Sequence, residues 1–134
     1  MPAEHRPRRS LRVLLTGPDA PALAVLLGLE PDLAPSVPPA HGPGTAGAVA
    51  DGRPEVVLLD DAAELAAVRA ADPEARVLLR VGSARPGPLA EALAAGAAGA
   101  VLRDVPAGEL AEAIRRAAAG ELVLDPPLRA PEPA

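Results

Sequence analysis

The 134-residue chain contains no aromatic residue, no cysteine and only one methionine. Without aromatic side chains it lacks the usual platforms for stacking nucleic-acid bases, and its formal net charge of −5 also disfavours direct nucleic-acid binding. The absence of cysteine excludes disulfides and thiolate metal sites and permits a cytoplasmic location. Lysine is missing as well, so all 13 basic residues are arginine. This composition suggests a GC-rich coding bias. Arginine at any one position is therefore weak evidence that the position requires arginine and not lysine.

Long hydrophobic runs are also absent. The longest uncharged run of small and apolar residues, 92–102, is far shorter than the roughly 20 residues that a membrane helix needs. Arg8-Arg9 resembles the start of a twin-arginine export signal, but residues 16–19 interrupt the apolar region that such a signal requires. We therefore expect a soluble, cytoplasmic protein without a membrane partner.

The chain is nevertheless long enough and apolar enough to form one domain with its own core. Hydrophobic residues make up 49% of it, mostly Ala, Leu and Val. Residues 1–10 are rich in Arg and Pro and predict a loose basic tail, with Arg6, Arg8 and Arg9 as its cations. Residues 125–134 predict a Pro-rich tail, which leaves 11–124 as the folded domain.

The stretch RPEVVLLDD at residues 53–61 is the centre of the predicted fold. Four consecutive apolar residues lie between a proline and two carboxylates. This pattern is typical of a short strand buried on both faces of a parallel sheet. Such a strand places Asp60 at its carboxyl end, where open α/β sheets bind their ligands.

Strand and helix patterns alternate along the chain and predict an α/β fold with a doubly wound five-stranded parallel sheet and helices on both faces. Pro35 and Pro38 confine the second strand to a sheet edge. Asp19 and Asp61 are predicted helix N-caps, and Gly120 is predicted to end the last helix. The predicted strands are 11–15, 32–37, 55–59, 75–81 and 99–102, and the predicted helices are 21–29, 45–51, 62–71, 89–95 and 107–119.

Residues 42–47, GPGTAG, match the dinucleotide-binding pattern G-x-G-x-x-G. That pattern binds a pyrophosphate only where it follows a regular strand and opens a long helix. Here the preceding strand is interrupted by proline and the predicted helix has only about two turns, which disfavours nucleotide binding. His5 and His41 have no partners at metal-ligand spacing, so neither is predicted to be catalytic.

Four segments, in this order, resemble the receiver domains of NarL/FixJ-type response regulators: PEVVLLD, RAADPEARVLL, EALAAGAAGAVLRD and PAGELAEAIRRAAAGELVL. The resemblance covers residues 11–124 and is most specific from Arg53 onward. It implies a flavodoxin-like fold with strand order 2-1-3-4-5. In that family the last segment leads into a DNA-binding helix-turn-helix. Only residues 125–134 follow it here, so that output domain is expected to be absent.

The resemblance assigns the phosphoacceptor position of a receiver to Asp60. Phosphoryl transfer to a carboxylate needs Mg²⁺, held largely by carboxylates and water, and a cation near the phosphoryl oxygens. The family's two acidic residues after the first strand fall on Gly17 and Pro18, which cannot bind a metal through their side chains. Asp61 and Asp19 are weak substitutes as metal ligands beside Asp60. No cofactor is therefore expected, with Mg²⁺ as the alternative.

Other family positions also depart from the receiver pattern. The hydroxyl residue after the fourth strand falls on Val81, and the switch aromatic of the fifth strand falls on Ala100. The family's lysine falls on Arg103, which keeps the charge but changes its reach and geometry. The structural alternative to a phosphoacceptor is an Asp60 carboxylate that pairs with Arg103 or caps the following helix. For Arg103-Asp104, the alternative to an anion contact is a surface turn.

The resemblance further implies a dimerisation and output face on the fourth helix, fifth strand and fifth helix. A protein partner or a second copy of the chain is expected there, although an ordinary solvated pair of helices would carry the same charges. The residues assigned to this face are Glu91, Ala100, Arg103, Asp104, Glu109, Glu112, Arg115 and Arg116.

Together these features favour a non-enzymatic, atypical receiver that acts in signal transduction or transcription regulation through protein–protein contacts. It would do so without Mg²⁺-dependent phosphorylation. Two alternatives stay open. In the first, Asp60 is phosphorylated by a histidine kinase. In the second, the chain is the remnant of a transcription regulator that lost its DNA-binding domain.

Overall fold

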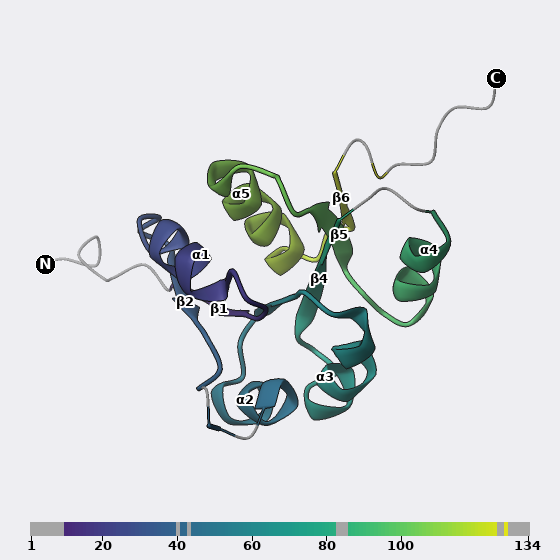
Figure 1. The fold of residues 1–134 in the computed structure, drawn as a ribbon, viewed down its shortest axis with the longest axis horizontal. Helices are drawn as coiled ribbons and strands as arrows, with labels where there is room; N and C mark the ends of the chain where they lie inside the picture. Colours follow the sequence, from purple (N-terminus) through teal and green to yellow (C-terminus); the bar gives the residue numbers. More distant parts are fainter. Residues whose placement is uncertain (1–9, 40, 43, 83–85, 126–127, 129–134) are drawn as a thin grey trace, which may run out of the picture.

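Within the described residues, six parallel strands form one sheet in the order β2-β1-β3-β4-β5-β6 (Figure 1). The computed structural model describes residues 10–39, 41–42, 44–82, 86–125 and 128. The strand order reverses between β1 and β3, because β2 lies on one side of β1 and all later strands follow on the other side. The strands are β1 (Leu11–Leu15), β2 (Leu33–Ser36), β3 (Val56–Leu59), β4 (Arg76–Val81), β5 (Gly99–Leu102) and β6 (Val123–Leu124).

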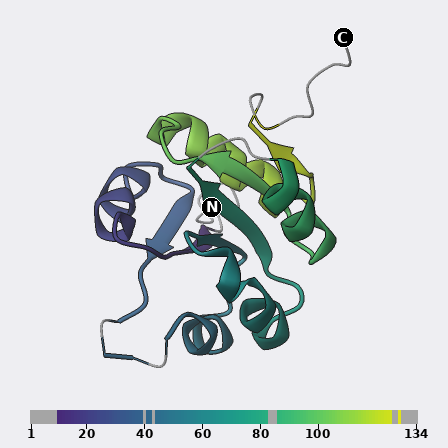
Figure 2. The same ribbon diagram turned by 45° about the vertical axis from the view of Figure 1, so that its right-hand side comes forward.

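Helices cover both faces of the sheet, as the alternating sequence pattern predicts. Figure 1 shows α1 and α5 on one side and α2 and α3 on the other, and Figure 2 shows the same arrangement after a 45° turn. Among the helices of the described residues, none has both the length and the apolar character needed to cross a membrane. The helices are α1 (Ala20–Leu27), α2 (Gly44–Gly52), α3 (Leu65–Ala71, after a 3₁₀ turn at Ala62–Glu64), α4 (Pro86–Ala94) and α5 (Ala107–Ala118).

β3 lies in the middle of the sheet and is buried on both faces. Val56 and Leu58 join the core cluster under α1 and α5, while Val57 and Leu59 join the cluster under α2, α3 and α4. All four side chains are fully buried. A strand covered by helices on both sides needs an apolar residue at every position, which explains the unbroken VVLL run. The predicted central strand is confirmed.

The predicted strand order is confirmed, with one short strand added at its end. β6 pairs with β5 through Gly99↔Val123 and Ala100↔Leu124. Periodicity does not reveal a strand of two residues, so the sequence predicts five strands where the described chain has six. α4 differs too, because it starts at Pro86 in a stretch predicted as loop. Proline is well tolerated in the first turn of a helix, where its missing N–H has no partner to lose.

Arg115 in α5 forms ion pairs with the chain just before β2, although the resemblance assigns this arginine to the partner face. The Arg115 guanidinium forms ion pairs with Asp32 at 2.8 Å and with Glu30 at 2.5 Å, both just before or at the start of β2. Hydrogen bonds to Asp32 and then Glu30 raise the pKa of Arg115 above its ordinary value. Its positive charge is therefore present at every pH below the ordinary pKa of arginine, and the ion pairs also need Asp32 and Glu30 to be ionised.

We predict that Arg115→Gln lowers the free energy of unfolding by about 1–2 kcal/mol, because it removes charge-assisted hydrogen bonds that join α5 to the α1–β2 connection. Arg116→Gln is the matched control, since Arg116 pairs only along the surface with Glu121. Its cost should stay below about 0.5 kcal/mol. Urea unfolding of both variants measures the difference, and equal losses would contradict the assigned role of Arg115.

Candidate functional site

Asp60 follows β3 at the carboxyl edge of the sheet, next to the ends of β1, β4 and β5. Open α/β sheets bind ligands at this edge, where the strand order reverses. The Asp60 side chain is only 15% exposed. It is therefore a largely buried carboxylate whose charge needs partners from the neighbouring strands.

Thr16 fixes the backbone at Asp60. Its hydroxyl donates a hydrogen bond to the carbonyl of Leu58 at 3.0 Å and accepts one from the backbone N–H of Asp60 at 3.1 Å. The Thr16 side chain is buried, so these bonds are shielded from water. Thr16 is not among the predicted site residues, although a polar residue at the end of an apolar strand is a usable signal.

Gly17 leaves the space that the Asp60 side chain occupies. Its φ is +97°, and a Cβ added to it would lie 2.6 Å from both Cβ and Cγ of Asp60. The resemblance places one of the family's acidic residues at Gly17. With the backbone as it stands, an acidic side chain at this position would collide with Asp60.

Arg80 supplies the cation at the centre of the site. Its side chain is 5% exposed, and NH1 lies 3.4 Å from Oδ1 of Asp60. NH2 lies 3.5 Å from Oδ2 of Asp19 and donates a hydrogen bond to the carbonyl of Arg103 at 3.1 Å. Sequence reasoning missed this residue. The available signal was a charge inside the otherwise apolar β4 run RVLLRV.

Arg103, after β5, approaches Asp60 from the other side. Its guanidinium pairs with Oδ1 of Asp60 and also donates a hydrogen bond to the Asp60 carbonyl oxygen at 3.2 Å. The Arg103 side chain is 40% exposed, so this pair sits at the rim. The structural alternative for Asp60 is either a pair with Arg103 or a cap on the following helix. The structure contains the ion pair with Arg103.

Asp19 and Asp61 take different roles. Asp19 precedes α1, as predicted, but makes no side-chain cap, because its carboxylate turns towards Arg80 instead. Asp61 caps the 3₁₀ turn, as predicted, by accepting a hydrogen bond from the N–H of Ala63 at 2.9 Å. The Asp61 carboxylate is therefore committed to the chain that follows it.

These residues do not fit a magnesium site. Mg²⁺ binds through carboxylates and water, but here the two carboxylates nearest the site, Asp60 and Asp19, already share the Arg80 guanidinium. Among the residues that the structure describes, no group of three or more His, Cys, Asp or Glu side chains could hold a metal ion. Arg80 occupies the place between the carboxylates that a divalent cation would need.

The remaining positions assigned by the resemblance carry no phosphoryl-binding group. Val81 is half-buried and has no hydroxyl, and Ala100 is fully buried. Within the assigned partner face, Arg115 and Glu112 pair with each other at 3.4 Å, while Arg116 pairs with Glu121. All four acidic residues of this face are exposed to solvent: Glu91, Asp104, Glu109 and Glu112.

The glycine pattern at residues 42–47 lies partly outside the described residues, since Pro43 is not among them. α2 begins at Gly44, and β2 ends at Ser36, well before the pattern starts. The pattern therefore does not follow a strand directly. His5 and the tail arginines Arg6, Arg8 and Arg9 also lie outside the described residues.

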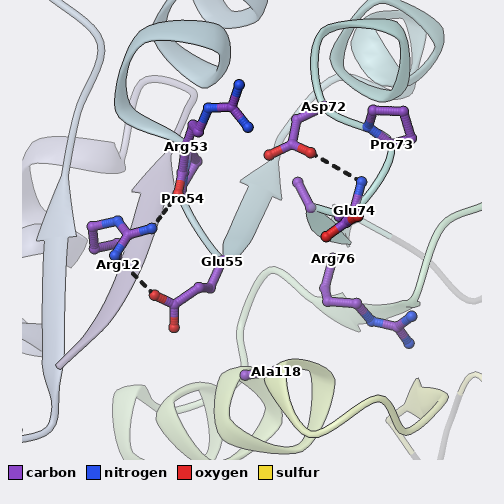
Figure 3. Close-up of a pocket in the computed structure, with 10 residues that line it drawn as sticks. Arg12, Arg53, Pro54, Glu55, Asp72, Pro73, Glu74, Arg76 and Ala118 are labelled. Carbon is purple, nitrogen blue, oxygen red and sulfur yellow. Dashed lines mark hydrogen bonds and ion pairs between the residues drawn. The ribbon is translucent and has the colours of Figure 1, made fainter. Parts of the chain in front are cut away.

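A pocket of about 540 Å³ opens at the opposite, amino end of the strands (Figure 3). Its arginines are largely used by the fold itself. Arg12 pairs with Glu55 at 3.1 Å, and Arg76 donates to the carbonyls of Ala117 and Glu121. The pocket also mixes charges of both signs, so it resembles a solvated groove more than a site for one ligand. Its lining is Arg12, Arg53, Pro54, Glu55, Asp72, Pro73, Glu74, Ala75, Arg76 and Ala118.

Comparison with known proteins identifies the fold. No protein-family model matches the chain, and no curated protein matches it either. Solved structures do. A two-component response regulator of the LuxR family from Aurantimonas sp. SI85-9A1 has a TM-score of 0.78 at 22% identity, covering 89% of this chain and 92% of that one.

Two further structures are similar over nearly their whole length. A signal receiver domain from Mycobacterium tuberculosis has a TM-score of 0.73 at 28% identity, covering 84% of this chain and 99% of that one. The response regulator domain of Thermotoga maritima CheB has a TM-score of 0.70 at 21% identity, covering 83% and 98%.

The chain has the receiver-domain fold. The predicted resemblance to response-regulator receivers and the predicted flavodoxin-like architecture are thus confirmed at the level of fold. Asp60 stands after the third strand of this receiver fold, and Arg103 after the fifth. Arg80, inside β4, is the cation that pairs with both Asp60 and Asp19.

We predict that Gly17→Ala destabilises the receiver fold by about 1–2 kcal/mol or more, because alanine is strained at φ +97° and its Cβ meets Asp60. Gly108→Ala in α5 is the control, since a Cβ there meets nothing within 4 Å. That change should stabilise by about 0.5–1 kcal/mol. Thermal and urea unfolding measure both, and a neutral Gly17→Ala would contradict the close approach to Asp60.

We predict that Asp60→Asn lowers the free energy of unfolding by about 2–3 kcal/mol, because it leaves the buried Arg80 charge with Asp19 as its remaining carboxylate partner among the described residues. Asp61→Asn should cost less than about 0.5 kcal/mol, since asparagine caps a helix as well as aspartate does. If Asp60 instead belonged to a cluster of mutually repelling acids, Asp60→Asn would raise the free energy of unfolding. Stabilisation by Asp60→Asn would therefore refute the internal ion-pair role.

Proposed function

We propose that this chain is an atypical receiver that works in signal transduction through protein–protein contact, without Mg²⁺-dependent phosphorylation and without an enzymatic activity of its own. The observation that supports this most directly is the buried Arg80 guanidinium between Asp60 and Asp19. In this arrangement the Asp60 carboxylate is neutralised by cations that belong to the chain itself. A covalent group is not required to complete the site.

The geometry at Asp60 also works against nucleophilic attack. Oδ1 accepts hydrogen bonds from both Arg80 and Arg103. An oxygen that shares its lone pairs with two guanidinium groups is a poorer nucleophile, because attack requires those interactions to be broken first. Val81 provides no hydroxyl for an incoming phosphoryl group.

Without phosphorylation, a change of state in this fold has to come from binding. A ligand shifts a two-state equilibrium only by as much as its affinity differs between the two states. We propose that a protein partner binds on the face that includes α4, β5 and α5. Transcription regulation through such a partner is compatible with the absence of a nucleic-acid-binding composition.

Phosphorylation of Asp60 by a histidine kinase remains the second candidate, because Asp60 keeps the position after β3 and Arg103 keeps a cation beside it. For that candidate Arg80 would have to leave the carboxylates so that Asp19 and Asp60 could face a metal ion. The two candidates differ in a single measurable property, the covalent state of the protein after exposure to a phosphodonor.

We predict no gain in intact-protein mass after incubation with acetyl phosphate and Mg²⁺, because Asp60 is held by two arginines. Asp60→Asn, treated in parallel, controls for transfer to other groups, and circular dichroism verifies that both proteins are folded. A gain of one phosphoryl group that is lost in Asp60→Asn would overturn the proposal and make Asp60 a working phosphoacceptor.

A further inference from the structure

The segment that follows α5, namely residues 120–125 together with Leu128, pairs with the edge strand β5. The N–H of Val123 donates to the carbonyl of Ala98 at 3.0 Å, and the N–H of Asp125 donates to the carbonyl of Ala100 at 3.3 Å. The sequence assigns Asp125 to a Pro-rich tail, yet its backbone continues the pairing with β5. The segment thus lies along β5 as an added, parallel strand (Figure 1).

Gly99 allows this segment to approach so closely. A Cβ at Gly99 would lie only 1.8 Å from the carbonyl oxygen of Val123 and 2.7 Å from its carbonyl carbon. Any side chain at this position would therefore push the segment away from β5. The edge of β5 is shaped to receive backbone, as glycine in a strand often indicates.

Two side chains of the segment make specific contacts. Oδ2 of Asp125 accepts a hydrogen bond from the backbone N–H of Leu102 at 2.8 Å, so it takes up a donor at the end of β5. Leu128 is 6% exposed and belongs to the buried cluster that includes Leu89, Ala92 and Ala100. Leu89 and Ala92 come from α4, so the leucine lies over the junction of α4 and β5.

Backbone pairing at a sheet edge combined with pockets for particular side chains is the mode by which sheets bind extended peptides. We propose that the β5 edge and the adjoining side of α4 form a peptide-binding groove, which the chain's own Val123–Asp125 and Leu128 occupy. The groove fits a segment with two apolar residues in strand conformation and a carboxylate next. A leucine three residues later follows a turn, since the N–H of Leu128 donates to the carbonyl of Asp125 at 2.8 Å. A protein partner that presents such a segment binds by displacing Val123–Asp125 and Leu128.

This inference rests on the proposed function only in placing a protein partner on the face that includes α4 and β5. The attachment has the properties of a displaceable one. β6 has only two residues, the neighbouring Leu122 is 58% exposed, and Gly120 at φ +93° gives the segment a turn at its start. A two-residue strand at a sheet edge opens more readily than the central strands, even though Val123 and Leu128 are buried.

The test uses a fluorescent peptide with the sequence of residues 120–128, GELVLDPPL, and the full-length chain. Asp125→Ala weakens the internal segment and frees the groove for a larger fraction of time. The peptide should therefore bind this variant about tenfold more tightly than it binds the wild type. Asp51→Ala, which removes an exposed carboxylate on α2, is the matched control and should bind like the wild type.

Two further variants establish where the peptide binds. Adding Gly99→Val to Asp125→Ala should abolish binding, because backbone can no longer approach β5. A peptide in which the aspartate is replaced by alanine should bind the Asp125→Ala chain more weakly than the original peptide. If the folded Asp125→Ala chain binds the peptide no better than the wild type does, the groove proposal is overturned.

Amide hydrogen exchange of the wild-type chain provides a second measurement that needs no variant. The N–H groups of Leu102 and Asp125, which the segment protects, should exchange at least about tenfold faster than those of β3. Exchange at the rate of β3 would show that the segment opens only with the whole fold and would overturn the proposal. Because neither measurement involves a phosphodonor, failure here is distinguishable from failure of the phosphorylation test.

Discussion

The guanidinium of Arg80 is the group on which this site depends. A charged side chain that is 5% exposed is tolerated only where it has opposite charges and hydrogen-bond acceptors around it. Asp60, Asp19 and the carbonyl of Arg103 supply them, from three separate loops at the carboxyl edge of the sheet. Removal of any one member leaves a buried charge with fewer partners, so the cluster behaves as part of the core and not as a detachable binding site. Gly17 belongs to the same arrangement, since only glycine leaves room for Asp60 at this distance.

This constraint changes what a receiver fold can do. A carboxylate site that depends on a divalent cation carries uncompensated negative charge until the ion binds, and its state then depends on the ion and the phosphoryl group. Here the cation is covalently part of β4 and is always present. In the proposed atypical receiver, Asp60 keeps these cation partners and signals enter elsewhere, through surfaces whose occupancy varies. Among the described elements, the β5 edge is a surface of that kind, because it is occupied by a short segment with few anchoring contacts.

The fold was predictable because its determinants are local and periodic. The four apolar residues of β3 and the amphipathic stripe of α5 predict their elements directly, and Pro35 predicts the edge position of β2. The site was less predictable, because its partners are far apart in the chain: Arg80 lies 61 residues from Asp19 and 20 from Asp60. Spacing cannot reveal such pairs, although a charge inside a buried strand signals that a partner exists. β6 escaped prediction for a different reason, since its pairing depends on Gly99 leaving room and not on any pattern in Val123–Leu124.

The two regions meet at the end of β5. Leu102 donates its backbone N–H to Asp125, and the next residue, Arg103, holds Asp60 through its guanidinium and Arg80 through its carbonyl oxygen. One peptide unit therefore connects the C-terminal segment to the ion-pair cluster. Coupling between sites requires an element whose arrangement both sites bias, and the residues at the end of β5 are the element that contacts both regions. If a partner removes Asp125 from Leu102, the position of Arg103 is the first to lose support. Because coupling is reciprocal for binding free energies, loosening Asp60 from Arg103 should likewise favour release of the segment.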